Sequence, residues 1–425
     1  MIREIEKEIK QDKKSISYKE FDIDLITEHN ELSKVFAFAI CIQTGSRNEK
    51  LEINGISHLL EHLIFKRSNR KSAKQIANKF EELGALANAF TSKENIVFYV
   101  RGLNENIKPI MNLMFEIVYN AKFILKEVEK EKLIILDEIN SYDDDAEESI
   151  YEIGEKLIFD SNPLSYTITG NKKSLSNIDL NSLNEYYNNN FNLSNSKFTF
   201  IGNFDENTIK KLIFTLFSKN SINQKESLPI ETSKITEMEV KILNKTIIKD
   251  FSQSHLLYLL PLINLNEEEK IILNLLNLLF GESMSSRLYY RFRESNALSY
   301  SVYSSIQAYS ECIVFYIYLS LDKTKLKKAN EILEKEINKL INGSIEKKEL
   351  KRSKEQLKTS IYVDNESLTE RLINLLKLNK NNLNEFSYEN FISKLNKIDT
   401  NMINEFCRTK LNLDKFSKIT YKEKS

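Results

Sequence analysis

The chain has 425 residues, which is too long for one ordinary domain and fits two domains of about 200 residues each. Its 61 basic and 61 acidic side chains cancel, so bulk charge gives no indication of a nucleic-acid partner. No uninterrupted apolar run reaches the roughly 18 residues that a membrane helix needs, so we expect no membrane insertion.

The first half of the chain predicts strands and helices in a defined order. We expect a strand at Val35–Ile42, a helix over 56–64, a helix at about Ala73–Leu83, paired strands near Ala85–Thr91 and Asn95–Arg101, long helices over about 105–160, and a strand at Lys197–Ile201. The run Val35–Ile42 is apolar throughout, which is typical of a buried strand.

The segment His58-Leu59-Leu60-Glu61-His62 gathers two of the four histidines of the chain around a glutamate. On a helix the two imidazoles lie one turn apart and point the same way, with Glu61 beside them. Two imidazoles in this arrangement can hold one zinc ion while the carboxylate deprotonates water. The order H-x-x-E-H is the inverzincin signature. The alternative is that the three polar side chains lie on a solvated helix face without a metal.

The surrounding residues favour a helix for this motif. Apolar side chains follow the i, i+3, i+4, i+7, i+8 spacing at Ile56, Leu59, Leu60, Leu63 and Ile64. Asn54 and Gly55 precede this stripe and suit a helix start. The apolar stripe would face the core, so the opposite side with the histidines would face a cleft.

A catalytic zinc ion usually takes three protein ligands, so a third ligand must come from elsewhere in the chain. The best candidates are Glu131 and Glu138, on an expected long helix that starts near Lys126. These glutamates share one helix face and lie about 10 Å apart along the axis. Without further information, either could instead be part of a charged outer surface.

The second half predicts a similar order of elements without a second H-x-x-E-H. We expect a strand at Ser254–Leu262, helices at about 267–280 and at the segment around Arg293, strands near Ser301–Tyr309 and Cys312–Ser320, and helices at about 324–340 and 346–360. His255 is expected to be a structural residue of its strand. The polar segment Lys219–Lys234 is the best linker candidate, between domains expected at 1–218 and 235–425.

These motifs resemble the pitrilysin and mitochondrial-processing-peptidase family of zinc endopeptidases, in particular its bacterial processing-protease-like branch. Glu138 follows His62 by 76 residues, the interval at which the family places its third zinc ligand. The resemblance thus implies one zinc per chain, held by His58, His62 and Glu138, with Glu131 as an accessory glutamate. Two further segments resemble the lead-in to the family's metal helix and its substrate-facing edge strand: Gly45-Ser46-Arg47-Asn48-Glu49 and Asn88-Ala89-Phe90-Thr91.

The second half carries its own resemblance, to the family's arginine–tyrosine segment. Arg293 and Tyr300 take the two matching positions, and both side chains donate hydrogen bonds that could hold a substrate carbonyl or an oxyanion. Two departures bear on specificity: only Gly281 remains of a glycine-rich loop, and the residues after Phe65 lack the usual glycine. Neither departure changes an expected metal ligand.

The resemblance implies an α+β fold of two homologous halves, one catalytic and one degenerate, each a mostly antiparallel sheet covered by helices, closing as a clamshell. The expected activity is zinc-dependent cleavage of extended peptides by a homodimer or a heterodimer with a related subunit, with Glu61 as the general base. A peptide would add to the edge strand around Ala87–Phe90. Two alternatives stay open: a dedicated processor of leader peptides or presequences, and a non-catalytic assembly subunit.

The cysteines and the first residues of the chain indicate a cytoplasmic protein. Cys41, Cys312 and Cys407 are odd in number and fit no metal spacing, and we expect Cys41 and Cys312 to be buried as small apolar side chains. The first residues mix acids and bases without an apolar signal core, and their acids argue against a mitochondrial presequence.

Overall fold

The computed structural model describes residues 16–18, 21–220, 240–376 and 388–423, and these residues form two compact units. The first unit comprises the described residues within Met1–Ile139, Tyr166–Thr232 and Asp364–Phe386. The second comprises those within Asn140–Ser165, Ser233–Val363 and Ser387–Ser425. Each unit therefore takes most of its residues from one half of the sequence and a short segment from the other half.

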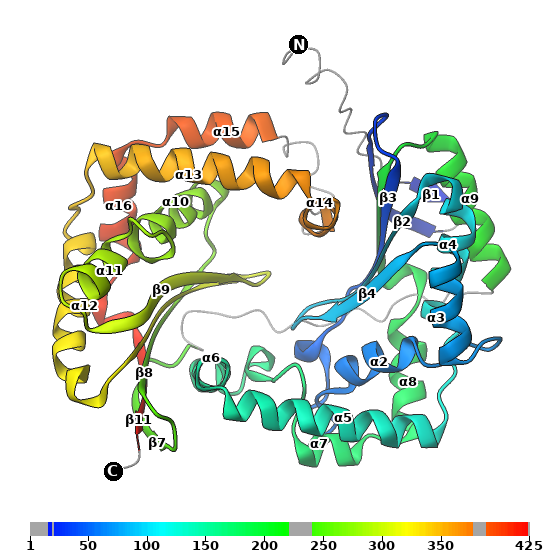
Figure 1. Ribbon diagram of the computed structural model, residues 1–425, viewed down its shortest axis with the longest axis horizontal. Helices are drawn as coiled ribbons and strands as arrows, with labels where there is room; N and C mark the ends of the chain where they lie inside the picture. The colour runs from blue at the N-terminus through cyan, green and yellow to red at the C-terminus, as the bar shows by residue number, and fades with distance from the viewer. Residues whose placement is uncertain (1–15, 19–20, 221–239, 377–387, 424–425) are drawn as a thin grey trace. The chain divides into compact units, whose positions relative to one another are not determined.

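The first unit is built on a six-stranded sheet with helices on both faces (Figure 1). Its strands are β1 (Ile16–Tyr18), β2 (Phe21–His29), β3 (Val35–Ile42), β4 (Leu86–Thr91), β5 (Ile96–Leu103) and β6 (Ser196–Gly202). Its helices are α2 (Ile56–Ile64), α3 (Ala73–Glu82), α4 (Ile107–Tyr119), α5 (Leu125–Asp144, whose last turn belongs to the second unit), α7 (Lys172–Asn177), α8 (Leu180–Asn190), α9 (Glu206–Asn220) and α14 (Leu368–Leu376).

The strand order β1-β2-β6-β3-β5-β4 places β3 inside the sheet and β4 at its edge. Strand β3 is buried on both faces, because its alternate side chains enter two different clusters. Phe36, Phe38 and Ile40 face the main core with α4, whereas Ala37 and Ala39 face leucines of α14. The small residues of the second set leave room for α14 to lie close to the sheet.

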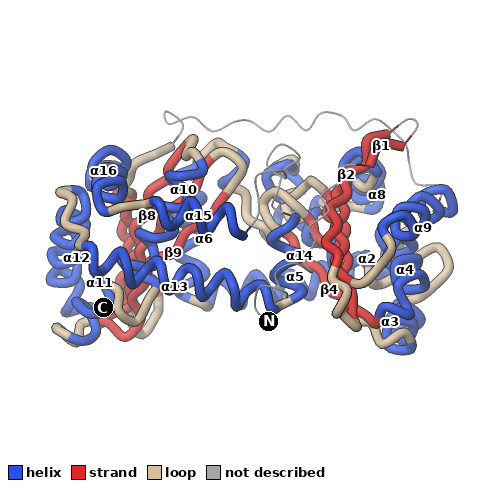
Figure 2. The backbone as a smooth tube through the Cα atoms, turned by 90° about the horizontal axis from the view of Figure 1, so that it is seen from above, coloured by secondary structure: helices blue, strands red, loops and turns tan. Residues whose placement is uncertain are grey.

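The second unit repeats this architecture around a five-stranded sheet. Its strands are β7 (Asn244–Lys249), β8 (Ser254–Ile263), β9 (Ser299–Ala308), β10 (Cys312–Leu321) and β11 (Ser417–Glu423). Its helices are α6 (Ala146–Phe159), α10 (Glu267–Asn277), α11 (Arg287–Tyr289), α12 (Leu326–Ile341), α13 (Lys347–Glu366, whose last residues lie outside the unit), α15 (Tyr388–Lys397) and α16 (Thr400–Lys410). Figure 2 shows the strands of each unit as a layer flanked by helices.

The two sheets share one connectivity, which confirms the prediction of two similar α+β halves. The order β4-β5-β3-β6-β2 in the first sheet corresponds to β9-β10-β8-β11-β7 in the second. In both sheets the last pair is parallel and the other pairs of this set are antiparallel. Strand β4 and strand β9 are therefore equivalent edge strands.

Most of the strands expected from the sequence lie within two residues of their expected positions, and Val35–Ile42 is found as expected. The elements that were not expected are strands β1, β2, β7 and β11 and helices α7, α8, α9, α14, α15 and α16. The linker candidate Lys219–Lys234 lies almost entirely outside the described residues, so the domain limits 1–218 and 235–425 stay a prediction. Within the described part of the chain, no helix combines the length and apolar character needed to cross a membrane.

Candidate metal centre

Helix α2 carries the H-x-x-E-H motif on its polar side and is anchored by its apolar side. Ile56, Leu59, Leu60, Leu63 and Ile64 are all at most 1 % exposed. The helix begins after Gly55, whose φ of 99° lies in the left-handed region. A Cβ at this position would lie 2.5 Å from the carbonyl oxygen of Thr169, so the helix start requires glycine for its conformation and for close packing.

Three candidate ligands from two helices converge at this surface. The Nε2 atoms of His58 and His62 each lie 3.8 Å from a carboxylate oxygen of Glu138 on α5. One ligand atom from each residue lies within 4.8 Å of the other two. Ligands about 2.1 Å from a tetrahedral zinc ion are about 3.4 Å apart, so the three atoms need only a small inward movement to bind zinc. Two imidazoles and one carboxylate match the donor set of a hydrolytic zinc site that keeps one position open.

Glu131 contacts Nδ1 of His62, the ring nitrogen that does not face Glu138. The carboxylate Oε2 of Glu131 lies 3.3 Å from Nδ1 of His62, and its Oε1 lies 3.0 Å from Nζ of Lys66. A carboxylate accepts hydrogen bonds, so Nδ1 of His62 must donate and its Nε2 is left with a lone pair. Glu131 is therefore placed where a carboxylate can orient a candidate histidine ligand, whereas Glu138 presents its oxygens to the Nε2 atoms of His58 and His62.

His58 has a different environment from His62. Burial, with a smaller contribution from the positive charge of His62, lowers the pKa of His58 to about 4. The imidazole is therefore neutral at pH 7, which is the form that binds zinc. Its Nδ1 is buried and has no hydrogen-bond partner among the described residues.

Glu61 lies beside the three candidate ligands and is bound to the edge strand. The hydroxyl of Thr91, the last residue of β4, donates a hydrogen bond of 2.5 Å to Oε2 of Glu61. Burial raises the pKa of Glu61, although the bond from Thr91 and the charge of His62 act in the opposite direction. A carboxylate with a raised pKa, next to a metal-binding donor set, is suited to accept and return a proton.

The structure brings the other two predicted site residues together within the second unit. The guanidinium carbon of Arg293 lies 5.0 Å from the ring centre of Tyr300 and 5.2 Å from that of Tyr289. Arg293 is thus in cation–π contact with two aromatic rings. Tyr300 is 79 % exposed, so its hydroxyl is accessible to a ligand. Their predicted action on a peptide at the metal centre stays a prediction.

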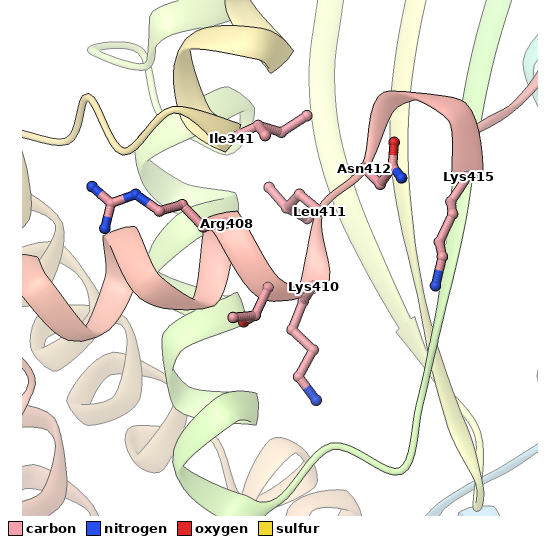
Figure 3. A pocket seen from close by; sticks show the side chains of 7 residues that line it. Ile341, Arg408, Lys410, Leu411, Asn412 and Lys415 are labelled. Carbon is pink, nitrogen blue, oxygen red and sulfur yellow. The ribbon is translucent and has the colours of Figure 1, made fainter.

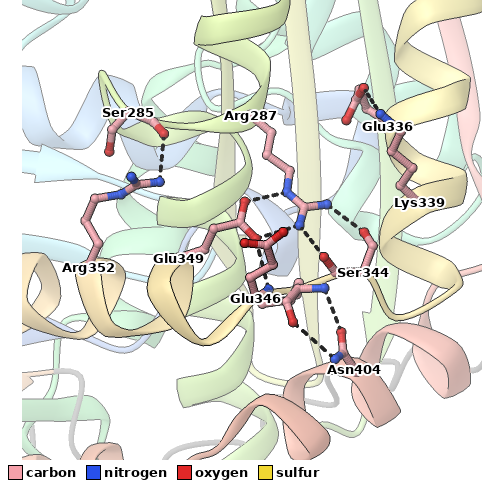
Figure 4. Close-up of polar contacts among 10 residues, drawn as sticks. Ser285, Arg287, Glu336, Lys339, Ser344, Glu346, Glu349, Arg352 and Asn404 are labelled. Carbon is pink, nitrogen blue, oxygen red and sulfur yellow. Dashed lines mark hydrogen bonds and ion pairs between the residues drawn. The ribbon is translucent and has the colours of Figure 1, made fainter.

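A half-buried ion pair fixes the start of the arginine–tyrosine segment to α13 (Figure 4). Arg287 donates from Nε and Nη2 to the two carboxylate oxygens of Glu349, at 2.9 and 2.7 Å. It also donates to the hydroxyl and the carbonyl oxygen of Ser344. Such a bidentate pair restricts the guanidinium in both position and orientation. The π-helical turn Tyr290–Glu294, which carries Arg293, begins directly after this anchored segment.

The structure has surface hollows that are lined by none of the candidate metal-site residues. One has a volume of about 490 Å³ and is lined by residues at the end of α12 and the C-terminal end of α16 and beyond, among them Arg408, Lys410 and Lys415 (Figure 3). It contains no carboxylate or histidine among its lining residues, so it does not compete with the metal centre as a candidate hydrolytic site.

Sequence reasoning did not find Thr91, Lys66 or Tyr289 as site residues. Thr91 lies in the segment identified as the edge strand, but its hydroxyl meets Glu61 only because β4 packs against α2. Lys66 lies four residues after His62, and its contact with Glu131 depends on how α5 packs beside α2, which spacing along the chain does not give.

Comparison with known proteins supports the same class of metal enzyme. The model of the insulinase family, peptidase family M16, matches residues 24–172, and the model of the M16 inactive domain matches residues 177–357. The uncharacterized zinc protease YmxG of Bacillus subtilis is 29 % identical over 91 % of this chain and 93 % of its own length. An uncharacterized zinc protease of Rickettsia felis is 34 % identical over 78 % of this chain and 79 % of its own length.

Solved structures show the same fold at lower sequence identity. A protease from Helicobacter pylori matches with a TM-score of 0.85 and 16 % identity, covering 97 % of this chain and all of that chain. A protein from Pseudomonas fluorescens, described as a peptidase M16 inactive domain, matches with a TM-score of 0.84 and 19 % identity over 94 % of this chain and 95 % of its own. The family models and the relatives named zinc proteases support a metallopeptidase. The chain belongs to peptidase family M16, whose relatives include proteins named zinc proteases.

Proposed function

We propose that the protein is a zinc endopeptidase that cleaves extended, unstructured peptides. The observation that carries this proposal is the convergence of His58, His62 and Glu138 next to Glu61, a carboxylate outside the ligand set. One zinc ion per chain would be held by these three side chains.

Zinc, when bound, would polarise the scissile carbonyl and make water easier to deprotonate. Glu61 would take the proton from water and pass it to the leaving amine. Thr91 would hold Oε2 of Glu61, which leaves the other carboxylate oxygen to exchange the proton. Glu131 would keep His62 in the tautomer whose Nε2 can bind the metal.

The edge strand supplies a docking position for the peptide backbone. Strand β4 pairs only with β5 among the described strands, so its other edge has no strand partner around Ala87–Phe90, and there the backbone N–H of Ala89 donates to Oδ1 of Asn88. An extended peptide can add there as a further strand, which gives affinity without a strict sequence requirement. Arg293 and Tyr300 would hold a substrate carbonyl or the developing oxyanion from the second half, and the site would close as a chamber built from two halves or two subunits.

A dedicated leader-peptide or presequence peptidase working with a related subunit would use the same residues and differ only in its substrate. The complete donor set of His58, His62 and Glu138 argues against the remaining alternative, a non-catalytic assembly subunit.

The test combines zinc content with cleavage of an unstructured peptide library. We expect wild type to carry one zinc and cleave, Glu61→Gln to keep zinc and lose cleavage, and Glu138→Ala to lose the metal, because each removes a different part of the chemistry. Asp137→Ala, an exposed neighbour on α5, is the matched control and should behave as wild type. Normal turnover by Glu61→Gln, or full zinc occupancy in Glu138→Ala, would contradict the proposal.

A further inference from the structure

The helix that carries the two histidines is held at its start by a buried carboxylate. Glu49 is 6 % exposed and lies in the turn before α2. Its Oε2 accepts hydrogen bonds of 2.7 Å from the side-chain amide of Asn54 and from the backbone N–H of Gly55. Its Oε1 accepts one of 2.8 Å from the backbone N–H of Ser57. All three donors are uncharged, so the carboxylate is not neutralised by a cation in this set.

The position of these donors gives Glu49 control over the first turn of α2. Gly55 precedes the helix, Ser57 is in its first turn, and Ser57 is followed directly by the candidate ligand His58. A carboxylate at this end interacts favourably with the partial positive charge of the helix N-terminus. Because its two oxygens bind N–H groups two residues apart, Glu49 fixes both the position of the helix end and its rotation about the axis.

The segment that leads to Glu49 is held by the turn that follows the edge strand. Two residues earlier, the backbone N–H of Arg47 donates to the carbonyl oxygen of Lys93 at 2.9 Å, and its guanidinium pairs with Glu94. A Cβ at Gly45 would lie 2.3 Å from the carbonyl oxygen of Ser92, so this segment packs directly on the turn. The same turn begins after Thr91, which binds Glu61.

Simple helix capping does not require this arrangement. Helices α6, α8 and α16 are capped by Asp145, Asp179 and Asp399, which lie directly before each helix and bind first-turn N–H groups. Helix α2 has glycine at this position and takes its cap from a buried side chain six residues upstream. Burial opposes ionisation of this carboxylate and raises its pKa to about 7. A short-range cap would stabilise the helix without this electrostatic cost.

We propose that Glu49 is a positioning residue of the metal centre, which sets the distance and rotation of His58 and His62 relative to Glu138 and of Glu61 relative to Thr91. This inference rests on the proposed zinc peptidase function. It assigns to Glu49 an effect on metal affinity and turnover in addition to any effect on folding.

The experiment compares wild type with Glu49→Gln at pH 8, where Glu49 is mostly ionised. The amide has the same shape, but its NH2 group meets an N–H donor where the carboxylate oxygen accepted a bond. Asn54→Ala removes the side-chain donor to Glu49, together with the bonds of that side chain to Thr167, and leaves the backbone donors in place, so it serves as a second variant. Glu52→Gln removes an exposed charge from the same loop and is the matched control.

Five quantities are measured: the zinc dissociation constant by chelator competition, the visible absorption of the cobalt(II)-substituted protein, kcat and KM on an unstructured peptide, and the thermal midpoint. For Glu49→Gln we expect about tenfold weaker zinc binding and a shifted cobalt spectrum, since supporting residues of metal sites have effects of this size. We expect kcat to fall about tenfold while KM stays within about twofold of wild type. Asn54→Ala should shift zinc affinity in the same direction by less, and Glu52→Gln should match wild type.

Unchanged zinc affinity and cobalt spectrum in both Glu49→Gln and Asn54→Ala would overturn the inference, whatever happens to the thermal midpoint, because Glu49 would then be only structural. Wild type that neither binds zinc nor cleaves peptides would instead remove the proposed function, and the inference with it. The two failures are therefore distinguished by the behaviour of wild type.

Discussion

At the residue scale, the two imidazoles of the candidate site are prepared for a metal in different ways. His62 has a carboxylate behind it that fixes its tautomer, whereas His58 is kept neutral chiefly by burial. His58 should therefore contribute a pH dependence to the stability of the metal-free protein.

The His58→Gln substitution should remove this contribution. The pKa of His58 falls from 6.5 in the unfolded chain to about 4 in the folded one, so the unfolded state takes up the proton first as pH falls. The stability is thus complete above pH 6.5 and is lost between pH 6.5 and 4, by about 2 kcal/mol at pH 5. Urea unfolding of zinc-free protein at pH 8 and pH 5 should show a loss about 2 kcal/mol smaller in His58→Gln than in wild type. Equal losses in the two proteins would show that His58 is not desolvated as described.

The hydroxyl of Thr91 should matter for turnover and not for metal binding. Thr91→Val keeps the shape of the side chain but removes the hydrogen bond to Glu61, so we expect kcat to fall about tenfold with zinc content unchanged. Thr91→Ser retains the hydroxyl and should keep most of the activity. Loss of zinc in Thr91→Val, or equal activity of the two variants, would contradict this role.

The sequence predicts those site residues that lie close together in a regular element. His58, Glu61 and His62 follow from helical spacing alone, whereas Glu138 required the resemblance to a family, because nothing local distinguishes it from Glu131. Thr91 and Glu49 could not be assigned a contact. Their contacts depend on how a turn and an edge strand pack against α2, and hydrophobic periodicity carries no information about that packing.

At the element scale, the sequence predicts the elements that their own local residue pattern specifies, and misses those that depend on distant partners. Strand β3 is an unbroken apolar run and was found where expected. Strands β2, β7 and β11 carry many charged side chains, and β11 pairs with β7 and β8, which lie far away in sequence. Such strands are stabilised by partners that a local pattern does not specify.

Close packing against β9 requires glycine at position 281, in the π-helical turn Leu278–Glu282. A Cβ at Gly281 would lie 2.3 Å from the backbone N of Ser304 on β9, and backbone on an adjacent strand cannot move aside easily. We expect Gly281→Ala to lower the free energy of unfolding of the second unit by about 1–3 kcal/mol. Denaturant unfolding measures this, with Ser285→Ala on the exposed side of the segment as control. A Gly281→Ala protein as stable as the control would show that the turn does not press on β9.

At the scale of the whole molecule, the two sequence halves exchange helices. Helix α6 from the first half packs on β8 and β11 of the second unit, and α14 from the second half packs on β3 and β6 of the first. Leu372 and Leu375 of α14 are buried against the sheet, and Arg371 pairs with Glu28 of β2. Each sheet therefore has one face that its own half of the sequence leaves uncovered.

Weakening the packing of α14 should destabilise the first unit, although α14 lies far from the rest of that unit in the sequence. We expect Leu372→Ala combined with Leu375→Ala to lower the free energy of unfolding of the first unit by about 4 kcal/mol or more, since each buried leucine contributes at least about 2 kcal/mol. Glu370→Ala, on the exposed side of α14, is the control. Calorimetry should show an early transition in the double variant, and an unchanged thermogram would mean that α14 contributes little to this unit.

The three cysteines have a practical consequence. Cys41 lies in the first sheet, and Cys312 and Cys407 lie in the second unit, all at most 3 % exposed. Burial raises the pKa of Cys41 and of Cys407 to about 12, so neither forms the reactive thiolate while its unit stays folded. Pulsed alkylation followed by mass spectrometry can therefore time the opening of each unit separately, with natural probes and without an introduced label.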